Sequence, residues 1–186
     1  DITSLQKLSG PLEWLEDNTP KDSTIFVLGK HYNWTIPIYT DDNVYFSSNA
    51  GLSVMPDMEL EERWAIQHFF DDIKSSDIAG NREIWANKFI DYYQNKENRR
   101  KILEFITGKK YPPTVLMDQI YIDRVLGAHK RFNNMGFEKA IKTYTVDYIL
   151  LDQSYGEYSK LTEAFKKYKF LTLQVKIGDT IIYKIN

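Results

Sequence analysis

The sequence contains no cysteine, and this absence removes a whole class of chemistry. The chain forms no disulfide bond and offers no thiolate, either as a nucleophile or as a metal ligand. Its three histidines, His31, His68 and His129, stand too far apart in the sequence for a zinc-binding motif. We therefore expect no metal site and no cofactor in this chain.

Long apolar runs and a large net charge are missing as well. No run of about 18 apolar residues occurs, so the sequence predicts neither a membrane-spanning helix nor a signal peptide in these residues. The formal net charge of −2 argues against nucleic acid as a partner, because nucleic-acid-binding domains present a dominant basic face. Gly29-Lys30 lies outside the glycine-rich frames that bind nucleotide phosphates, so we expect no nucleotide site of that kind.

Apolar residues are plentiful by contrast: 42% of the residues are hydrophobic and 15% are aromatic. A chain of 186 residues with this composition can form one domain, or one domain with a sizeable insertion. The sequence begins at Asp1 rather than at a methionine, a few residues before a predicted helix. We therefore expect a piece of a longer protein, cut or processed at this point.

The stretch from Pro11 to Lys30 predicts the element around which the rest is organised. Leucines recur at the 3.6-residue period of an amphipathic helix, at Leu5, Leu8, Leu12 and Leu15. Pro20 ends that helix near Asn18, because proline lacks an N–H and disfavours helical backbone at Thr19. Residues 24–28 are then apolar without alternation, which is typical of a strand covered on both faces in a parallel sheet.

Further strands are predicted along the chain. Residues 35–40 indicate an edge strand interrupted by Pro37, and residues 44–46 indicate a short strand. Residues 146–152 repeat the continuous apolar pattern of a buried parallel strand.

The C-terminal residues predict a hairpin. Residues 171–177 and 181–185 alternate between apolar and polar, and Gly178-Asp179 between them suits a type II′ turn. We expect an α/β fold of three layers, with a mixed, mainly parallel sheet that ends in an antiparallel C-terminal hairpin and carries a helical insertion.

A helical block lies between the strand segments. The first of its four helices is predicted from residue 57 up to a break at Gly80-Asn81, and the others over residues 82–94 and 97–107 and from Thr114 onward. Gly108 suits the position just after the third helix, where left-handed backbone is common. Four successive helices exceed what one crossover between parallel strands needs. We therefore assign residues 1–56 and 135–186 to an α/β sheet domain, and residues 57–134 to a helical insertion or cap within it.

Three segments resemble a pattern in the soluble C-terminal domains of prokaryotic membrane glycosyltransferases of the GT-C type, which include oligosaccharyltransferase-like and protein-mannosyltransferase-like proteins. The first, LEWLEDNTPKDSTIFVLG, is similar to a helix reading W-[LI]-x-x-N-[TS]-P that precedes the first strand of that domain. The second, FEKAIKTYTVDYILLD, is similar to a short helix followed by a V-D-Y strand. The third, FLTLQVKIGDTIIYKIN, resembles the terminal hairpin. The three segments occur in the expected order and cover about half of the chain, and the helical block has no counterpart.

The resemblance implies that the chemistry lies elsewhere. In such enzymes, acidic residues of the membrane half hold the metal and the lipid-linked sugar donor, whereas the soluble domain lies on the extracytoplasmic side and shapes acceptor access. We therefore expect an extracytoplasmic domain of the cell membrane without catalytic residues of its own. Its partners would be the transmembrane portion of its parent chain and an acceptor substrate or glycan. The chain departs from the family pattern at Thr40-Asp41-Asp42, where many relatives have Gly-Arg, and it lacks the W-W-D-Y-G signature.

Polar side chains follow the two predicted buried strands. In open α/β sheets, ligands collect at the carboxyl ends of parallel strands. If the two strands are neighbours, a cation, an imidazole and a carboxylate converge there, as sugar or phosphate binding or acid–base chemistry needs. The candidate ligand-binding residues are Lys30, His31, Tyr32, Trp34, Asp152 and Tyr155. The alternative is that these are solvated loop residues near a strand end.

Two further hypotheses stay open. The chain is alternatively a free-standing soluble α/β protein or enzyme that binds a sugar or phosphate at Lys30, His31 and Asp152. In a third interpretation the helical block is a protein-interaction cap, which predicts a large exposed apolar patch on it. Small basic groups, such as Arg99-Arg100-Lys101, are expected on solvated faces, although a surface beside anionic lipid uses such residues too.

Overall fold

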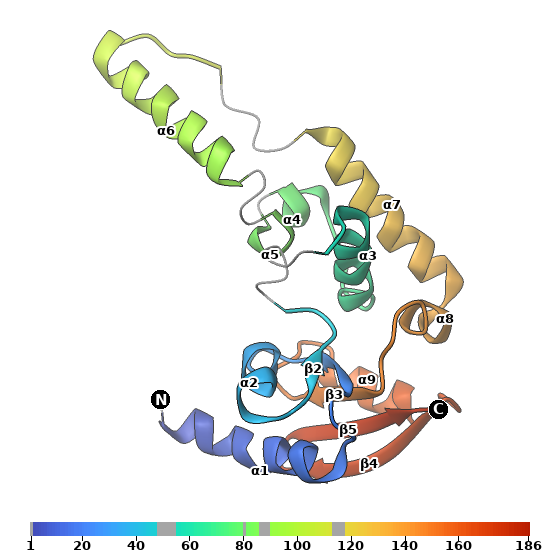
Figure 1. Ribbon diagram of the computed structural model, residues 1–186. Helices are drawn as coiled ribbons and strands as arrows, with labels where there is room; N and C mark the ends of the chain where they lie inside the picture. The colour runs from blue at the N-terminus through green and yellow to red at the C-terminus, as the bar shows by residue number, and fades with distance from the viewer. Residues whose placement is uncertain (1, 48–54, 80, 86–89, 113–117) are drawn as a thin grey trace. The chain divides into compact units, whose positions relative to one another are not determined.

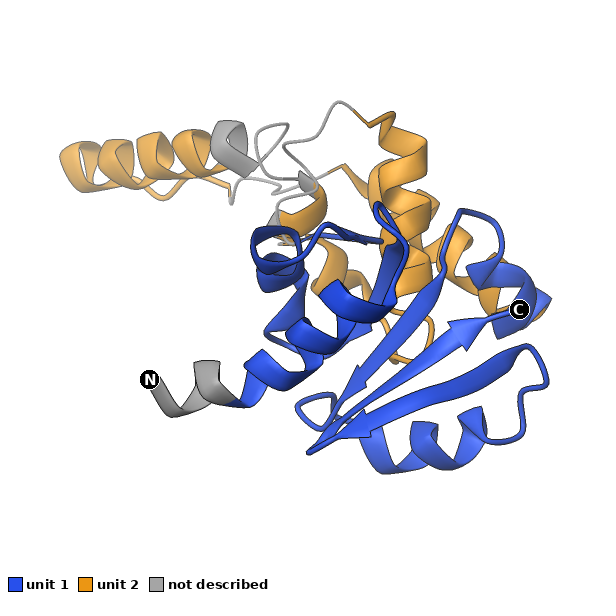
Figure 2. Ribbon diagram, turned by 60° about the horizontal axis from the view of Figure 1, so that its bottom comes forward, with its two compact units in different colours: residues 1–47, 135–186 blue, residues 48–134 orange. Residues whose placement is uncertain are grey.

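The structure, a computed structural model, describes residues 2–47, 55–79, 81–85, 90–112 and 118–186. The chain divides into two compact units, which Figure 2 shows in different colours. The sheet unit comprises residues 1–47 and 135–186, and the helical unit comprises residues 48–134. The boundaries that we expect from the sequence fall after residues 56 and 134.

The sheet unit is built on five strands (Figure 1): β1 (Thr24–Leu28), β2 (Asn43–Val44), β3 (Tyr148–Asp152), β4 (Leu171–Ile177) and β5 (Thr180–Ile185). They lie in the order β2-β1-β3-β5-β4. β1 pairs in parallel with β2 and β3, whereas β5 is antiparallel to both β3 and β4. Four strands therefore run in one direction and β5 opposes them. The predicted α/β class, with a mixed sheet and an antiparallel C-terminal hairpin, is confirmed.

One face of the sheet is covered by α1 (Ile2–Asn18) and α2 (Tyr32–Tyr39). One buried cluster joins leucines of α1 to side chains of α2, β1, β3 and β5: Leu8, Leu12, Leu15, Tyr32, Ile36, Ile25, Val27, Tyr148, Leu150 and Ile182. The helical period predicted for the α1 leucines is confirmed at the last three, and the Leu5 side chain lies outside the described part. Each leucine buried in this way contributes about 1.5–3 kcal/mol.

Aromatic rings cover the opposite face, together with α8 (Phe137–Ile141) and α9 (Tyr158–Phe165). The Phe137 ring stacks on Phe165 with centroids 5.8 Å apart, and its edge meets Phe26 of β1 at 6.2 Å. Phe165 in turn meets Tyr183 of β5 at 5.5 Å. Both faces of β1 are therefore buried, which is the physical reason for its continuous apolar sequence.

The strand predicted over residues 35–40 is wrong, because these residues belong mostly to helix α2. Tyr32 and Ile36, four residues apart, are buried on one side, while Ile38 and Tyr39 are 65% and 60% exposed. This stripe of burial follows the helical period, and it outweighs the local disadvantage of Pro37 within a short helix. The Ile36 carbonyl ends the helix by accepting from the backbone N–H and the hydroxyl of Thr40, each at 2.9 Å.

The helical unit contains α3 (Asp57–Gln67), α4 (Ser75–Ala79), α5 (Arg82–Trp85), α6 (Ile90–Thr107) and nearly all of α7 (Gln119–Met135). The single helix predicted from residue 57 up to Gly80-Asn81 is wrong, because α3 ends at Gln67 and α4 is a separate helix. The break predicted between 94 and 97 is also wrong, since α6 runs through it. Gly108 has a φ of +67°, which confirms the expected left-handed position after that helix. The predicted helix start at Thr114 lies outside the described residues.

Ion pairs join α3 to α7 within the helical unit. Glu61 is only 2% exposed and accepts two hydrogen bonds from the Arg124 guanidinium. Closer to the surface, the Glu62 carboxylate accepts a hydrogen bond of 2.6 Å from the Arg131 guanidinium. Two neighbouring carboxylates of α3 thus supply partners for a second helix.

Candidate functional site

A pocket of about 660 Å³ opens at the edge of the sheet where β1 and β3 end. β1 and β3 are parallel neighbours, so their carboxyl ends meet at this edge. β5 runs the other way, and its first residue, Thr180, pairs with Asp152 at the end of β3. The lining residues are Lys7, Leu8, His31, Tyr32, Asp152, Gln153, Ser154, Ile177, Gly178, Asp179 and Thr180. We call this hollow the strand-end pocket.

Asp152 is held by neutral hydrogen-bond donors in the wall of this pocket. Its Oδ2 accepts from the Thr180 hydroxyl at 2.9 Å. Its Oδ1 accepts from the backbone N–H of Ser154 at 2.9 Å and from the Ser154 hydroxyl. The Thr180 hydroxyl has one proton, so the Tyr32 hydroxyl, 2.9 Å away, donates to Thr180. The result is a directed chain from Tyr32 through Thr180 to Asp152.

The Tyr32 phenol stays neutral in this chain. Burial raises its pKa to about 12, and the negative charge of Asp152 acts in the same direction, against the smaller lowering effect of the hydrogen bond with Thr180. A phenol with this pKa is protonated at neutral pH and acts as a donor. The series of hydrogen bonds from Tyr32 through Thr180 therefore positions the Asp152 carboxylate, and Tyr32 does not act as a base.

Gly29 allows the ends of β1 and β3 to approach closely. A Cβ atom at this position would lie 2.7 Å from the Cβ of Asp152, well inside van der Waals contact. Just beyond it, the backbone N–H of Lys30 donates to the Ser154 hydroxyl at 3.0 Å. The glycine thus allows a backbone hydrogen bond that ties the two strand ends together.

The structure brings three of the six candidate site residues together. His31, Tyr32 and Asp152 line the strand-end pocket, whereas the Lys30, Trp34 and Tyr155 side chains lie outside its lining. Lys30 contributes only its backbone N–H. Trp34 belongs to helix α2 and is half exposed.

Several pocket residues were not predicted from the sequence. Lys7 comes from α1, Gln153 and Ser154 follow β3, and Asp179 and Thr180 come from the hairpin that joins β4 to β5. The sequence predicts both strands of this hairpin and its turn, but not where the hairpin lies in the sheet. Its position opposite Asp152 depends on the register between β3 and β5, for which the local sequence carries no signal.

The pocket offers both donors and acceptors. Asp152 and Asp179 supply carboxylate oxygens, Lys7 supplies an ammonium group, and His31 supplies an imidazole. Two carboxylates beside one ammonium group repel a phosphate anion. The hydroxyls of a neutral sugar, by contrast, can donate to the carboxylates and accept from the ammonium group. Among the described residues, no group of three or more His, Asp or Glu side chains is arranged to hold a metal ion.

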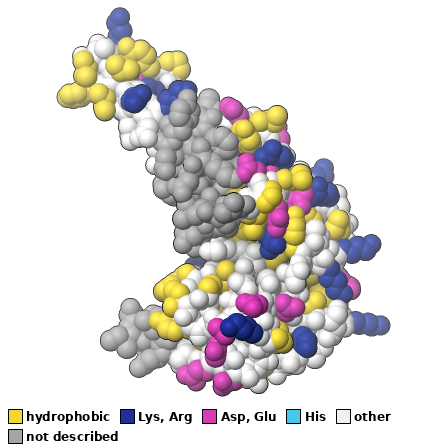
Figure 3. Space-filling view, in the orientation of Figure 1, with side chains coloured by type: hydrophobic (Ala, Val, Ile, Leu, Met, Phe, Trp, Pro, Cys, Tyr) yellow, Lys and Arg dark blue, Asp and Glu magenta, His cyan; other side chains and the backbone are white. Residues whose placement is uncertain are grey.

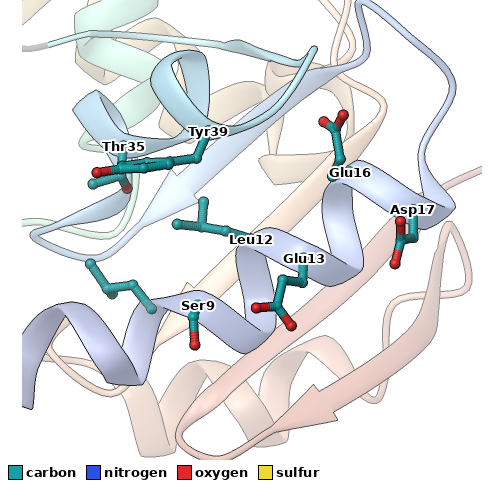
Figure 4. A pocket seen from close by; sticks show the side chains of 8 residues that line it. Ser9, Leu12, Glu13, Glu16, Asp17, Thr35 and Tyr39 are labelled. Atoms are coloured by element: carbon teal, nitrogen blue, oxygen red, sulfur yellow. The ribbon is translucent and has the colours of Figure 1, made fainter.

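A second hollow, a groove of about 350 Å³, lies between α1 and α2. Figure 4 shows Leu12 of α1 and Tyr39 of α2 facing each other across it. Its charged lining residues are all acidic: Glu13, Glu16 and Asp17. We call it the acidic groove. Its charge and apolar floor favour a cationic ligand with apolar parts over a sugar or a phosphate.

No protein-family model matches this chain, and neither a curated protein nor a solved structure matches it. In the described part of the chain, none of the helices has the length and apolar character needed to cross a membrane. The strand-end pocket and the three family-like segments are therefore the features of this chain that bear on its function.

Proposed function

We propose that this chain is the extracytoplasmic accessory domain of a polytopic membrane glycosyltransferase that uses lipid-linked sugar donors. The domain is non-catalytic by itself. Its partners are the transmembrane portion of its parent chain and a glycan or acceptor substrate that contacts the strand-end pocket.

The observation that carries this proposal is the way the three family-like segments assemble. The first supplies the C-terminal part of α1 and all of β1, the second supplies α8 and β3, and the third supplies β4 and β5. β1, β3 and β5 are consecutive neighbours in the sheet, although the helical unit separates β1 from β3 in the sequence. The three segments thus supply four of the five strands of one sheet, and that sheet has a core of its own, which an independent soluble domain needs.

Asp147, the acidic residue of the V-D-Y motif, hydrogen-bonds to the other two segments. Its carboxylate accepts from the backbone N–H of Thr24 at 2.8 Å, and its own N–H donates to the Thr24 carbonyl at 2.9 Å. Its carbonyl accepts from the N–H of Ile185 at 2.9 Å. One motif residue therefore connects the starts of β1 and β3 to the end of β5, which supports reading the three segments as one pattern.

The N-T-P residues of the first segment also have structural roles. The Asn18 side chain donates to the Trp14 carbonyl at 2.9 Å, and the Thr19 hydroxyl lies 2.8 Å from the Leu15 carbonyl oxygen. Both side chains thus bond to carbonyl groups in the last turn of α1, where the Leu15 carbonyl also accepts from the backbone N–H of Thr19 at 3.0 Å. The pattern thus corresponds to a defined helix end before β1.

The test uses the complete reading frame that contains these residues. We expect its product to fractionate with integral membrane proteins, and this domain to be cleaved by protease added from the extracytoplasmic side. Deleting the domain should abolish sugar transfer to the acceptor while the membrane half still binds the lipid-linked donor. A complete product that fractionates as a soluble protein would overturn the proposal.

The composition of the strand-end pocket favours a second candidate, a free-standing sugar-binding protein. Both candidates predict that short neutral oligosaccharides shift the backbone NMR signals of His31 and Asp179. The triple variant Lys7→Ala, His31→Ala, Asp179→Asn should weaken that binding at least about tenfold, since each lost hydrogen bond to a charged group is worth about 1.5–3 kcal/mol. Glu13→Gln with Asp17→Asn in the acidic groove is the matched control. Only the fractionation experiment separates the two candidates.

A further inference from the structure

An exposed apolar face lies on the C-terminal half of α6. Its four large apolar side chains are Phe105, 91% exposed, Ile106, 71%, Ile102, 57%, and Leu103, 48%. In a helix with 3.6 residues per turn, positions at these spacings lie on one side. Figure 3 shows hydrophobic side chains gathered over this end of α6, with Lys and Arg beside them. We call these four residues the α6 apolar face.

The other side of the same helix holds an ion-pair network. The Arg100 guanidinium lies 2.5 Å from a Glu97 carboxylate oxygen and 2.6 Å from a Glu104 carboxylate oxygen. These residues stand three and four positions apart, so they share the side opposite the apolar face. Both acidic residues of segment 94–112 are therefore paired away from that face.

The chain after α6 is fastened to the same network. Gly108 adopts left-handed backbone, the Tyr111 N–H donates to Glu104 at 2.9 Å, and Arg100 donates to the Tyr111 carbonyl at 3.3 Å. This return of the chain keeps Lys109 and Lys110 at the same end of α6 as the apolar face. The α6 apolar face and these two lysines are thus held at the same end of the helix by hydrogen bonds within residues 100–111.

The charge of this segment is opposite to that of the whole chain. Residues 96–110 contain six basic and two acidic side chains, an excess of four positive charges, whereas the chain carries −2. On a helical wheel, Lys96 and Lys101 fall on the two flanks of the apolar face. Lysines at such positions can keep their ammonium groups in the headgroup layer while the apolar side chains between them insert.

We propose that the α6 apolar face and its flanking lysines bind the surface of an anionic lipid bilayer, with Phe105 and Ile106 entering between the headgroups. The charge excess selects an anionic surface. Four apolar residues are few for a protein interface, which buries about 20–30 residues a side, but they suffice with basic flanks for interfacial lipid binding. This inference depends on α6 alone, and it holds whether or not the proposed function is correct.

The experiment is co-sedimentation of the purified chain with vesicles. We expect binding to vesicles of phosphatidylglycerol mixed with phosphatidylcholine, weaker binding as salt is raised, and little binding to phosphatidylcholine alone. Because the chain has no cysteine, an environment-sensitive dye on Ile102→Cys reports insertion directly. Its emission should shift to the blue on anionic vesicles, and the same dye on Lys176→Cys in the sheet unit should not respond.

Two double variants separate the apolar and the electrostatic contributions. Phe105→Ser with Ile106→Ser should lower the partition coefficient on anionic vesicles at least about tenfold. Lys109→Gln with Lys110→Gln should lower it by about fivefold for each charge removed, at low salt only. Matched controls in the sheet unit are Ile38→Ser with Tyr39→Ser and Lys167→Gln with Lys169→Gln, and neither should change binding. Circular dichroism and unfolding midpoints verify that every variant is folded.

Three outcomes would overturn the proposal. One is equal binding to anionic and neutral vesicles, and another is binding that Phe105→Ser with Ile106→Ser leaves intact. The third is self-association of the chain that is lost both in that variant and in Glu13→Gln with Asp17→Asn. That result would show instead that the basic end of α6 docks in the acidic groove of a second copy.

Discussion

The Asp42 carboxylate is 4% exposed and lies 2.8 Å from the hydroxyl oxygen of Thr19. The same hydroxyl lies 2.8 Å from the Leu15 carbonyl oxygen, and its single proton can serve only one of these two acceptors. If Asp42 is protonated, the acid donates to Thr19 and Thr19 donates to Leu15, so every group is satisfied. Burial raises the pKa of Asp42 above its usual value, against the lowering effect of the Thr19 hydrogen bond, which agrees with this arrangement.

Asp42→Asn should therefore stabilise the protein at neutral pH, by about 1 kcal/mol, because the amide can donate to Thr19 without a buried charge. A raised folded-state pKa means that the stability linked to Asp42 is fully present below the unfolded value, about 3.9, and is lost as the pH rises through the folded value. Urea unfolding at a series of acidic pH values should show that the unfolding free energy falls less with rising pH in Asp42→Asn than in the unsubstituted protein. Asp41→Asn, in the exposed pair with Lys21, is the control. An unchanged pH dependence in Asp42→Asn would contradict this account.

Tyr32→Phe removes the first donor in the series of hydrogen bonds from Tyr32 through Thr180 to Asp152. The substitution should lower the unfolding free energy by about 1 kcal/mol. The pKa of Tyr32 in the folded protein is about 12, above the value of about 10 for an exposed tyrosine. Its contribution to stability is therefore present below about pH 10 and is lost as the pH rises through 12. Alkaline titration of the phenolate absorbance should lack this late component in the variant. Tyr39→Phe, in an exposed side chain, should retain it.

Gly29→Ala should destabilise the protein by about 1–3 kcal/mol, because the new methyl group would meet the Cβ of Asp152 at 2.7 Å. Gly127→Ala is the matched control, since Gly127 lies within α7 and a Cβ there meets nothing within 4 Å. That control should stabilise the helix by about 0.5–1 kcal/mol. Thermal unfolding of both variants measures this difference. Equal changes in the unfolding temperature of Gly29→Ala and Gly127→Ala would refute the close approach of β1 and β3.

Arg124→Ala should destabilise the helical unit by about 3 kcal/mol, because it leaves the Glu61 carboxylate buried without its cation. Arg131→Ala removes the more exposed pair between the same two helices and should cost less than about 1 kcal/mol. Urea unfolding of the two variants, followed by far-UV circular dichroism, gives the comparison. Similar losses for both would mean that Glu61 is solvated in the folded protein.

Elements with strong local signals were predicted from the sequence. The apolar runs of β1 and β3, the leucine period of α1 and the positive φ at Gly108 and Gly178 all follow from properties of a few consecutive residues. The strand predicted over residues 35–40 is wrong for the same reason, because Pro37 and the neighbouring β-formers give a stronger local signal than a short helical stripe. The polar residues before Arg100 predict a break within α6, whereas the ion pairs of Arg100 with Glu97 and Glu104 support a continuous helix there.

By itself, the order of amino acids determined where α1 ends, where the buried strands run and where the final hairpin turns, because a missing N–H, a leucine period and a glycine act locally. Only the tertiary structure decided which side chains share the strand-end pocket. Thr180 reaches Asp152 through the register of β5 on β3, and Lys7 reaches the same place because α1 packs across the sheet. Such pairings join residues far apart in the chain, and their energy comes from burying both partners together, which no local pattern encodes.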